Sequence, residues 1–455
     1  MPNIAVKQAL TSEGWARDVL ISIDADGRIA RIGAGAEAAD CHVDIALPAP
    51  ANLHSHTFQR AMAGLTEFRG PDPQDSFWTW RSLMYRFLDK LTPDHVEAIA
   101  AQVFLESLEA GFGAVAEFHY LHHAPGGVTY DDIAEMGARV VAAAVDTGAG
   151  LTLLPVLYSQ GGCDGRPLVG GQLRFGNDPD SFAKLHAASV SAVMSGPADF
   201  RTGVAPHSLR AVTSDALEMV AEEHPDGPVH IHLAEQVAEV DEVVATYGVR
   251  PVKWLLEHTP ADGRWCAIHA TQMTAAETAG LATRGVVAGL CPITEANLGD
   301  GTFCGTAFRA AGGTFGVGSD SNVHVALFEE LQALEYSQRL RDRRRAALAD
   351  AERSTGRVLF EEAARGGAQA AGRVAGTLAV GAQADILGVA ADNEWLCNRQ
   401  GDAALDSLIF GGHGRDCITD VWSAGRHVVR DGRHIRRDEI TGRFRAVMDE
   451  LGQAI

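Results

Sequence analysis

The sequence predicts an α/β protein: a (β/α)8 TIM barrel with a small β-sandwich domain built from both termini. The main observation is that apolar, strand-like runs alternate with amphipathic stretches through residues 51–370. Eight such runs begin near residues 52, 113, 151, 202, 229, 265, 286 and 314. Eight strand–helix units within roughly 300 residues is the count of a TIM barrel.

The stretches between these runs carry apolar residues at helical spacing, which predicts helices on the outside of the barrel. The predicted helices cover residues 92–110, 130–147, 178–194, 214–223, 237–247 and 274–284.

Both ends of the chain show short strands and turns instead. Runs at 19–24 and 28–33 flank an Ala-Asp-Gly turn, and strand patterns return at 384–390 and 420–432. Such alternation, bounded by Gly and Asp, is typical of β-hairpins. We therefore expect residues 1–50 and 371–455 to pair into one β-sandwich, with the metal-dependent barrel at 51–370.

Composition limits the classes of partner. A formal charge of −21 argues against binding to nucleic acid or to an anionic membrane surface. The seven cysteines show no CxxC spacing, and no run reaches the length of a membrane helix. The first residues do not resemble a signal peptide. We expect a cytoplasmic protein with reduced thiols and a small-molecule partner.

Polar residues gather where the predicted strands end, and in a TIM barrel this rim builds the active site. His54 and His56 stand at i and i+2 on the first strand, so both side chains face the same way. Taken alone, such a pair is also compatible with two hydrogen-bonded histidines at a strand end. Together, the two imidazoles could reach one ion at about 2.0–2.1 Å.

Two further strands offer ligands to the same ion. The fifth strand carries His230 and His232, again at i and i+2, and the alternation leaves open which of them is the ligand. Asp320 follows the last strand and would add a carboxylate. Three histidines and one aspartate from distant strands predict one divalent ion per subunit. Nitrogen-rich ligation favours Zn²⁺, with other first-row metals as alternatives.

This pattern resembles the amidohydrolase superfamily, as do the β-rich termini. The resemblance implies a ligand set of His54, His56, His232 and Asp320. The two-metal members of that superfamily use a lysine on strand four, and residues 202–209 contain none. The sequence therefore resembles the mononuclear deaminase branch, whose His-x-x-Glu matches the stretch that ends at Glu235.

Within that branch, the segments NLHSHTFQRAMAG, AEFHYLHH, APHSLRAV, HIHLAEQ and CPITEANLGDG are similar to those of N-formimino-L-glutamate deiminases. Two positions depart from the expected histidine, Gln272 in HATQM and Asn322 after GSDS. The resemblance implies hydrolysis of N-formimino-L-glutamate to N-formyl-L-glutamate and ammonia, a step of histidine degradation. It also implies a homodimer.

The chemistry assigns catalytic roles to three residues. A divalent ion lowers the pKa of water and so supplies hydroxide at neutral pH. Asp320 can contact the ion and accept a proton from the water. His269 can hold the hydroxide or polarise the tetrahedral centre, and Glu235 can carry protons to the substrate nitrogen.

The implied substrate is a dicarboxylate, and a guanidinium is the strongest clamp for a carboxylate. Arg210, which follows strand four, is the first choice. The resemblance adds Gln59, Tyr120 and His207 as further substrate contacts. Arg81 lies in a long segment after strand one, where closure over the site and a surface salt bridge are equally compatible readings.

Two other functions remain open at this point. The first is a deaminase of a purine or another heterocycle, which would favour an apolar stacking pocket over an arginine clamp. The second is a metal-free scaffold of the same fold, although every expected ligand is present. Ammonia release from a substrate panel and the metal content distinguish the three functions.

Overall fold

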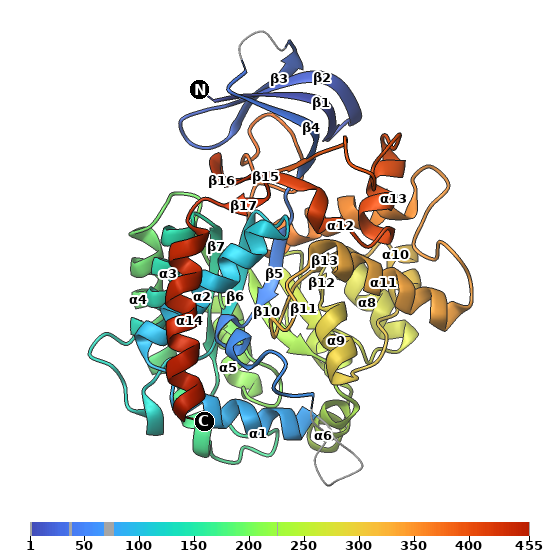
Figure 1. Cartoon of the computed structure of the whole chain (residues 1–455). Coiled ribbons are helices and arrows are strands. Elements are labelled where there is room, and N and C mark those ends of the chain that lie inside the picture. Colours follow the sequence, from blue (N-terminus) through green and yellow to red (C-terminus); the bar gives the residue numbers. More distant parts are fainter. Residues whose placement is uncertain (1, 36–38, 68–76, 225, 455) are drawn as a thin grey trace.

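The fold has two parts, a mixed sheet built from both ends of the chain and an α/β region of parallel strands between them (Figure 1). The computed structural model describes residues 2–35, 39–67, 77–224 and 226–454. Within these residues, no helix is long and apolar enough to cross a membrane.

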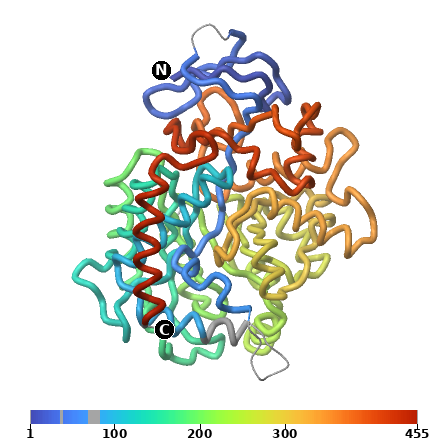
Figure 2. Tube along the Cα trace, in the orientation of Figure 1, coloured from blue at the N-terminus to red at the C-terminus, as the bar shows by residue number. Residues whose placement is uncertain are grey.

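The mixed sheet has eight strands in the order β17-β16-β15-β14-β4-β1-β2-β3. Its strands are β1 (Asn3–Thr11), β2 (Gly14–Ile23), β3 (Ile29–Ala34), β4 (Cys41–Pro48), β14 (Ile386–Val389), β15 (Ile418–Ser423), β16 (Arg426–Arg430) and β17 (Arg433–His434). β4 joins the two ends by pairing parallel with β1 and antiparallel with β14. In Figure 2, the blue first part of the chain accordingly lies against orange and red segments from near the other end, whereas the C-terminus itself lies far from the N-terminus.

This sheet confirms that the two termini pair into one sheet domain, with hydrogen bonds continuous through all eight strands. Val19, Ile21 and Ile23 of β2 are buried at every second position, as expected of a strand with one face in a core. They share a hydrophobic cluster with Ile386 and Trp422 from the other end of the chain.

The α/β region contains two parallel sheets. One consists of β5 (Ala51–Ser55), β6 (Ala114–His119), β7 (Gly150–Leu157), β8 (Arg201–Thr202) and β9 (Ala205–Pro206). The other consists of β10 (Val229–Leu233), β11 (Trp265–His269), β12 (Val287–Leu290) and β13 (Phe315–Val317). Each of the eight predicted runs begins within one residue of an observed strand, and the predicted fourth run is divided into β8 and β9.

Isolated parallel bridges connect these two sheets at both ends. One bridge pairs Ser55 with Asp320, and the other pairs Val204 with Val229. We call these junctions the first seam and the second seam. The prediction of an α/β protein with parallel strands is confirmed. Regular strand pairing, however, is continuous only within each sheet. At each seam, the two sheets are joined by one isolated β-bridge.

Helices follow the strands and cover the outside of both sheets (Figure 1). Those that match the six predicted segments are α2 (Pro93–Glu109), α3 (Glu135–Thr147), α4 (Pro179–Met194), α5 (Ser214–Glu223), α6 (Val237–Tyr247) and α8 (Ala275–Arg284). The others are α1 (Phe77–Leu88), α7 (Pro251–His258), α9 (Pro292–Leu298), α10 (Gly305–Ala310), α11 (Leu327–Asp342), α12 (Thr355–Ala370), α13 (Asp402–Phe410) and α14 (Arg437–Ala454).

Local sequence explains where several of these helices begin and end. The side chains of Thr92 and Asp178 accept hydrogen bonds from the backbone N–H groups of His95 and Ser181, which caps α2 and α4. A proline occupies the first position of both helices, where its missing N–H is not needed. Gly248 ends α6 in the left-handed conformation that glycine adopts most easily.

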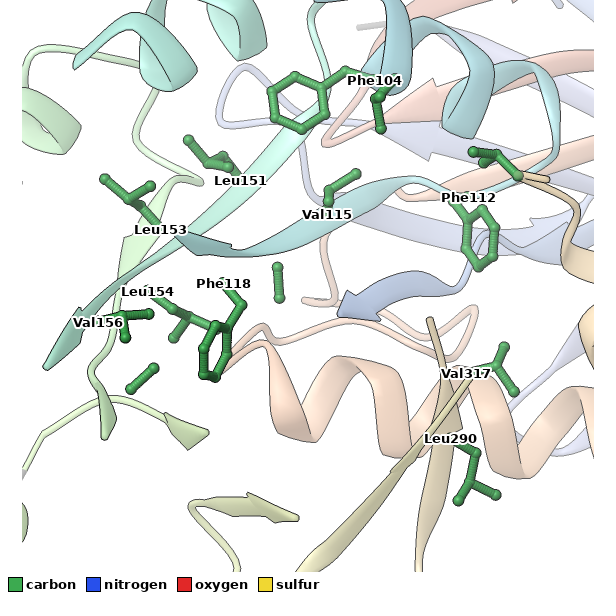
Figure 3. Close-up of a cluster of buried hydrophobic side chains, with 14 of the residues drawn as sticks. Phe104, Phe112, Val115, Phe118, Leu151, Leu153, Leu154, Val156, Leu290 and Val317 are labelled. Carbon is green, nitrogen blue, oxygen red and sulfur yellow. The ribbon is translucent and has the colours of Figure 1, made fainter. Parts of the chain in front are cut away.

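The strands of the α/β region are buried on both faces. Val115 of β6 and Leu151 of β7 face the surrounding helices, where Phe104 of α2 also lies (Figure 3). Phe118 of β6 projects to the opposite side, where its ring contacts the ring of His54 at a centroid distance of 5.2 Å. The interior between the strands is therefore a packed core with functional side chains above it.

The C-terminal end of α12 closes the bottom of this interior. The carbonyl of Ala371 accepts a hydrogen bond from Thr152 Oγ1 at 2.7 Å, and the carbonyl of Ala370 lies 2.8 Å from His230 Nε2. The close approach requires glycine, because a Cβ on Gly366 would stand 1.9 Å from the carbonyl oxygen of Phe315. His230 Nε2 and Thr152 Oγ1 are thus paired at the bottom of this interior.

Candidate metal and catalytic site

The predicted site residues meet in one cavity at the C-terminal ends of the parallel strands. Together with the solvent at its open mouth, the cavity comprises about 590 Å³ of space not filled by protein atoms. Residues predicted for metal binding and proton transfer line one part of it, namely His56, His232, Glu235, His269 and Asp320. Residues predicted for substrate binding line the other part, namely Gln59, Tyr120, His207 and Arg210.

Four buried side chains converge at the inner end of this cavity. Asp320 Oδ1 lies 3.4 Å from His54 Nε2 and 3.3 Å from His56 Nε2. His232 Nε2 lies 3.2 Å from His54 Nε2. The ligand atoms of His54, His56 and His232 all stand within 4.8 Å of one another, as do those of His54, His269 and Asp320. The structure therefore brings together all four residues of the predicted ligand set.

The hydrogen bonds of two imidazoles show which nitrogens face the centre. His56 Nδ1 lies 2.9 Å from the carbonyl oxygen of Phe118, and His232 Nδ1 lies 3.2 Å from that of His207. A carbonyl only accepts, so both Nδ1 atoms carry the proton and both Nε2 atoms present lone pairs. Burial lowers the pKa of both rings, which favours this neutral form.

This arrangement fits a bound cation. Bare nitrogen lone pairs and a carboxylate oxygen would repel one another in a buried space unless a positive charge lay between them. Burial lowers the pKa of His54 to about 3, so a proton on that ring does not supply this charge. Imidazoles oriented by hydrogen bonds to carbonyl groups are the usual surroundings of a metal ion.

Asn322 is one of the two positions where the sequence has another residue in place of the expected histidine. Its hydrogen bonds hold the backbone of Asp320. Its side-chain amide donates to the carbonyl oxygens of His56 and Asp320, both at 3.0 Å, and to Ser55 Oγ at 3.2 Å. Its side-chain oxygen accepts a hydrogen bond from Ser319 Oγ at 2.6 Å. The asparagine therefore ties β5 to the loop after β13 and takes no position in the cavity lining.

His269 and Glu235 lie beside the converging ligands. His269 Nε2 is 3.8 Å from Glu235 Oε1 and 3.9 Å from Asp320 Oδ2. Burial lowers the pKa of His269, but Glu235 and the neighbouring carboxylates outweigh it and hold that pKa well above its usual value. Glu239 accepts hydrogen bonds from the backbone N–H groups of Ala234 and Glu235, at 3.0 and 2.9 Å, and so fixes the loop that carries Glu235.

The predicted substrate contacts form the outer part of the cavity. Gln59 Nε2 donates to the Tyr120 hydroxyl at 2.6 Å, and His207 Nδ1 lies 3.0 Å from Ser208 Oγ. Arg210 is half-buried, and its Nε has no hydrogen-bond partner among the described residues. Arg81 lies within α1, but its side chain is outside the described part of the structure.

The sequence did not identify three aromatic residues that line the same cavity, Tyr85, Tyr158 and Phe175. They come from α1, from the end of β7 and from a loop, and no local motif marks them. Glu117 of β6, which lies within the segment AEFHYLHH, is a fourth residue near the site without a predicted role. It accepts hydrogen bonds at 2.7 Å from both the N–H and the hydroxyl of Thr57, at the start of η1 (Thr57–Met62), which carries Gln59.

Gln272, the second departure, lies at the edge of the site. Its side-chain amide donates to the carbonyl oxygen of Asp300, and its backbone N–H donates to Ala234 at 2.8 Å. Among the described residues, it does not line the cavity. Gln272 thus connects the loop after β11 with the loop that contains Asp300.

Comparison with known families agrees with this geometry. Residues 45–428 match the model of the Amidohydrolase family, and residues 1–41 match that of "Formimidoylglutamate deiminase HutF, N-terminal domain". The chain belongs to the amidohydrolase family. The Amidohydrolase match spans all the parallel strands and, in the mixed sheet, β14, β15 and parts of β4 and β16.

Two relatives of this amidohydrolase cover nearly the whole chain. The formimidoylglutamate deiminase of Pseudomonas aeruginosa is 49% identical over 99% of this chain and 100% of its own. A crystal structure described as an amidohydrolase from Brucella melitensis has a TM-score of 0.95 at 48% identity, covering 99% of this chain and 100% of its own.

A more distant solved structure shares the fold alone. It is an adenosine deaminase from Xanthomonas campestris with bound zinc, with a TM-score of 0.82 at 22% identity. It covers 99% of this chain and 98% of its own.

Proposed function

We propose that this amidohydrolase hydrolyses N-formimino-L-glutamate to N-formyl-L-glutamate and ammonia, a reaction of histidine degradation. The observation that carries the proposal is the shared cavity, in which three imidazoles and a carboxylate converge a short distance from a half-buried guanidinium. The relative from P. aeruginosa, 49% identical over its full length, bears the name of this activity.

The cofactor in this proposal is one Zn²⁺ ion per chain, held by His54, His56, His232 and Asp320. Three nitrogen ligands and one carboxylate suit Zn²⁺, although other first-row divalent ions accept the same donors. When bound, such an ion lowers the pKa of water and polarises the carbon–nitrogen double bond.

The side chains around this centre move the protons. Water adds to the formimino carbon, and Asp320 accepts the proton that the water loses. Glu235 delivers one proton to the terminal nitrogen and Asp320 passes on a second, so that the bond between that nitrogen and the carbon breaks and ammonia leaves. The hydroxyl on the carbon returns its proton to Glu235 as the formyl carbonyl forms. Burial raises the pKa of Glu235 despite the opposing charge of His269, which favours the protonated form that can donate to the substrate. His269 holds the attacking oxygen in place.

The substrate's carboxylates require fixed donors, and Arg210 is the first of these. Burial alone would lower the pKa of Arg210. The nearby carboxylates of Glu239 and Glu235 have the larger, opposite effect, so the pKa is raised and the guanidinium stays charged. A charged guanidinium that lines the cavity can bind an anion. Gln59, Tyr120 and His207 add hydrogen bonds along the substrate chain.

We also propose that the two parallel sheets act as one (β/α)8 barrel, with residues 51–370 as the catalytic domain. Three hydrogen bonds between backbone groups support this at the second seam, from Val204 to Pro228, from His230 to Val204 and from His232 to His207, each 3.0 Å long.

A substrate panel tests the proposed function. We expect ammonia release from N-formimino-L-glutamate that stops when a chelator is added. The Arg210→Met variant should raise KM strongly and lower kcat less, because the lost ion pair binds a part of the substrate that does not react. Adenosine and 5-methylthioadenosine test the alternative of a heterocycle deaminase, which the aromatic residues Tyr85, Tyr158 and Phe175 could accommodate by stacking. Ammonia release from these compounds alone would overturn the proposal.

A further inference from the structure

Glu295 is a buried carboxylate next to the site that the proposed reaction does not use. It lies in α9, the helix that follows β12, and its side chain is 6% exposed. One of its oxygens, Oε1, is 3.2 Å from His269 Nδ1. The same oxygen accepts a hydrogen bond from the backbone N–H of Cys291 at 2.8 Å.

These two contacts determine which nitrogen of the His269 ring donates a hydrogen bond to Glu295. An oxygen that already accepts from a backbone N–H acts as an acceptor, so the imidazole must be the donor in the second contact. Nδ1 therefore carries a proton in both the neutral and the charged form of the ring. The other nitrogen, Nε2, faces the cavity between Glu235 and Asp320.

The backbone places this ring but does not determine its rotation. His269 and the residue after it both have positive φ angles, 67° and 47°, at the end of β11. Such left-handed conformations are costly outside glycine and occur where the surrounding structure imposes them. A half-turn of the ring about its bond to Cβ would still exchange Nδ1 for a carbon atom. A hydrogen bond to Nδ1 prevents that rotation.

We propose that Glu295 is a positioning residue that holds His269 with its proton on Nδ1 and with Nε2 directed at the reacting atoms. Hydrogen bonds of this kind select the tautomer and orientation of functional histidines. The kinetic consequence rests on the proposed function, whereas the tautomer itself does not depend on any substrate.

Two other roles for Glu295 would give different results. It could serve only to cap α9, since it accepts the N–H of Cys291 at the start of that helix. It could also hold a second cation, because ligand atoms of His269, Cys291 and Glu295 lie within 4.8 Å of one another. The test must therefore separate positioning from helix capping and from metal binding.

The test combines NMR of the Zn²⁺-loaded protein with kinetics. Selective ¹⁵N labelling of histidine reports the tautomer of each of the 18 rings, and His269→Gln identifies the signal of His269. In the wild-type protein we expect Nδ1 to be protonated. In Glu295→Ala this preference should be lost, and kcat should fall by roughly 10- to 100-fold with little change in KM. Glu295→Gln keeps an acceptor oxygen, so it should retain the tautomer and much of kcat.

Asp178→Ala is the matched control for the loss of an acidic helix cap. Asp178 Oδ1 accepts the backbone N–H of Ser181 at 2.8 Å on the outside of the molecule. This variant should lower the melting temperature and leave kcat within about 2-fold of the wild type.

Three results would overturn the proposal. They are a wild-type His269 that carries its proton on Nε2 alone, a Glu295→Ala variant with kcat equal to that of Asp178→Ala, and the loss of one bound metal equivalent in Glu295→Ala. If Glu295→Ala does not fold, the wild-type tautomer and the Glu295→Gln variant still decide the question. A wild-type enzyme without activity on N-formimino-L-glutamate would contradict the proposed function and leave the NMR result intact.

Discussion

The two seams between the parallel sheets perform the same structural task by different means. At the second seam, hydrogen bonds between backbone groups join the strands, as from His230 to Val204. At the first seam, two backbone hydrogen bonds link Asp320 with His54 and His56, each 2.9 Å long. A buried chain of side chains, Asn52, Ser319 and Asn322, reinforces them.

The difference follows from what each seam carries. Three of the four proposed ligands, His54, His56 and Asp320, belong to the first seam, and Asp320 has a strained φ of 45°. Close approach is also required there, since a Cβ on Gly318 would stand 2.7 Å from both backbone N and O of His54. We infer that the side-chain network holds a strained backbone in place where ligand geometry matters most.

The largest expected effect is at the first seam. His56→Ala should abolish metal binding and lower turnover by more than the roughly 10²–10³-fold that follows loss of one transition-state donor. The fold should survive, because the core is built from other residues. Metal analysis and an ammonia assay measure both effects. Wild-type turnover in this variant would show that the ligand assignment is wrong.

The next effect concerns the side-chain network itself. Asn322→Ala should lower the free energy of unfolding by about 2–4 kcal/mol, because buried hydroxyl and carbonyl groups lose their partners. Metal affinity should fall as well, since Asp320 loses its support. Urea unfolding and a competitive chelator titration measure these changes.

Asn322 has a positive φ of 56°, so alanine would add backbone strain. Asn322→Gly removes the same hydrogen bonds without this strain and is the matched control. If the glycine variant were as stable as the wild type and bound metal equally well, the network would have no role in holding the site.

The smallest effect is expected at the second seam, from His230→Gln. His230 is fully buried, and its Nε2 pairs with the carbonyl of Ala370 at the bottom of the interior between the strands. Its loss should cost about 1–3 kcal/mol of stability, as for other broken buried hydrogen bonds. Metal content and kcat should stay close to wild type, in contrast to His232→Gln, which should lose the ion. Loss of metal in His230→Gln would reverse the two roles.

The sequence predicted the regular parts of this fold well because strands and helices leave local, periodic patterns. The segment 214–223 was predicted with the bounds observed for α5. The sequence did not predict the division of the fourth strand, because the division depends on contacts with residues distant in sequence. Gly203, which lies between β8 and β9, is an example: a Cβ there would lie 2.4 Å from the carbonyl oxygen of Pro228.

The candidate site was predictable where its residues lie in recognisable motifs at strand ends. His54, His56, His232 and Asp320 were found in this way, and the structure brings them together. The roles of Asn322 and Glu295 were not predictable, because each acts through a partner on another strand. The sequence could not decide between His230 and His232 as the ligand, because both side chains face the interior between the strands. In the structure, His232 lines the cavity, whereas His230 lies below it against Ala370.

The most direct test of the central claim is a titration of the metal-free protein with Zn²⁺ while ammonia release from N-formimino-L-glutamate is measured. We predict that turnover rises in proportion to added metal and reaches its maximum at one equivalent per chain. Equal turnover in the metal-free protein, or no turnover at one bound equivalent, would contradict the account.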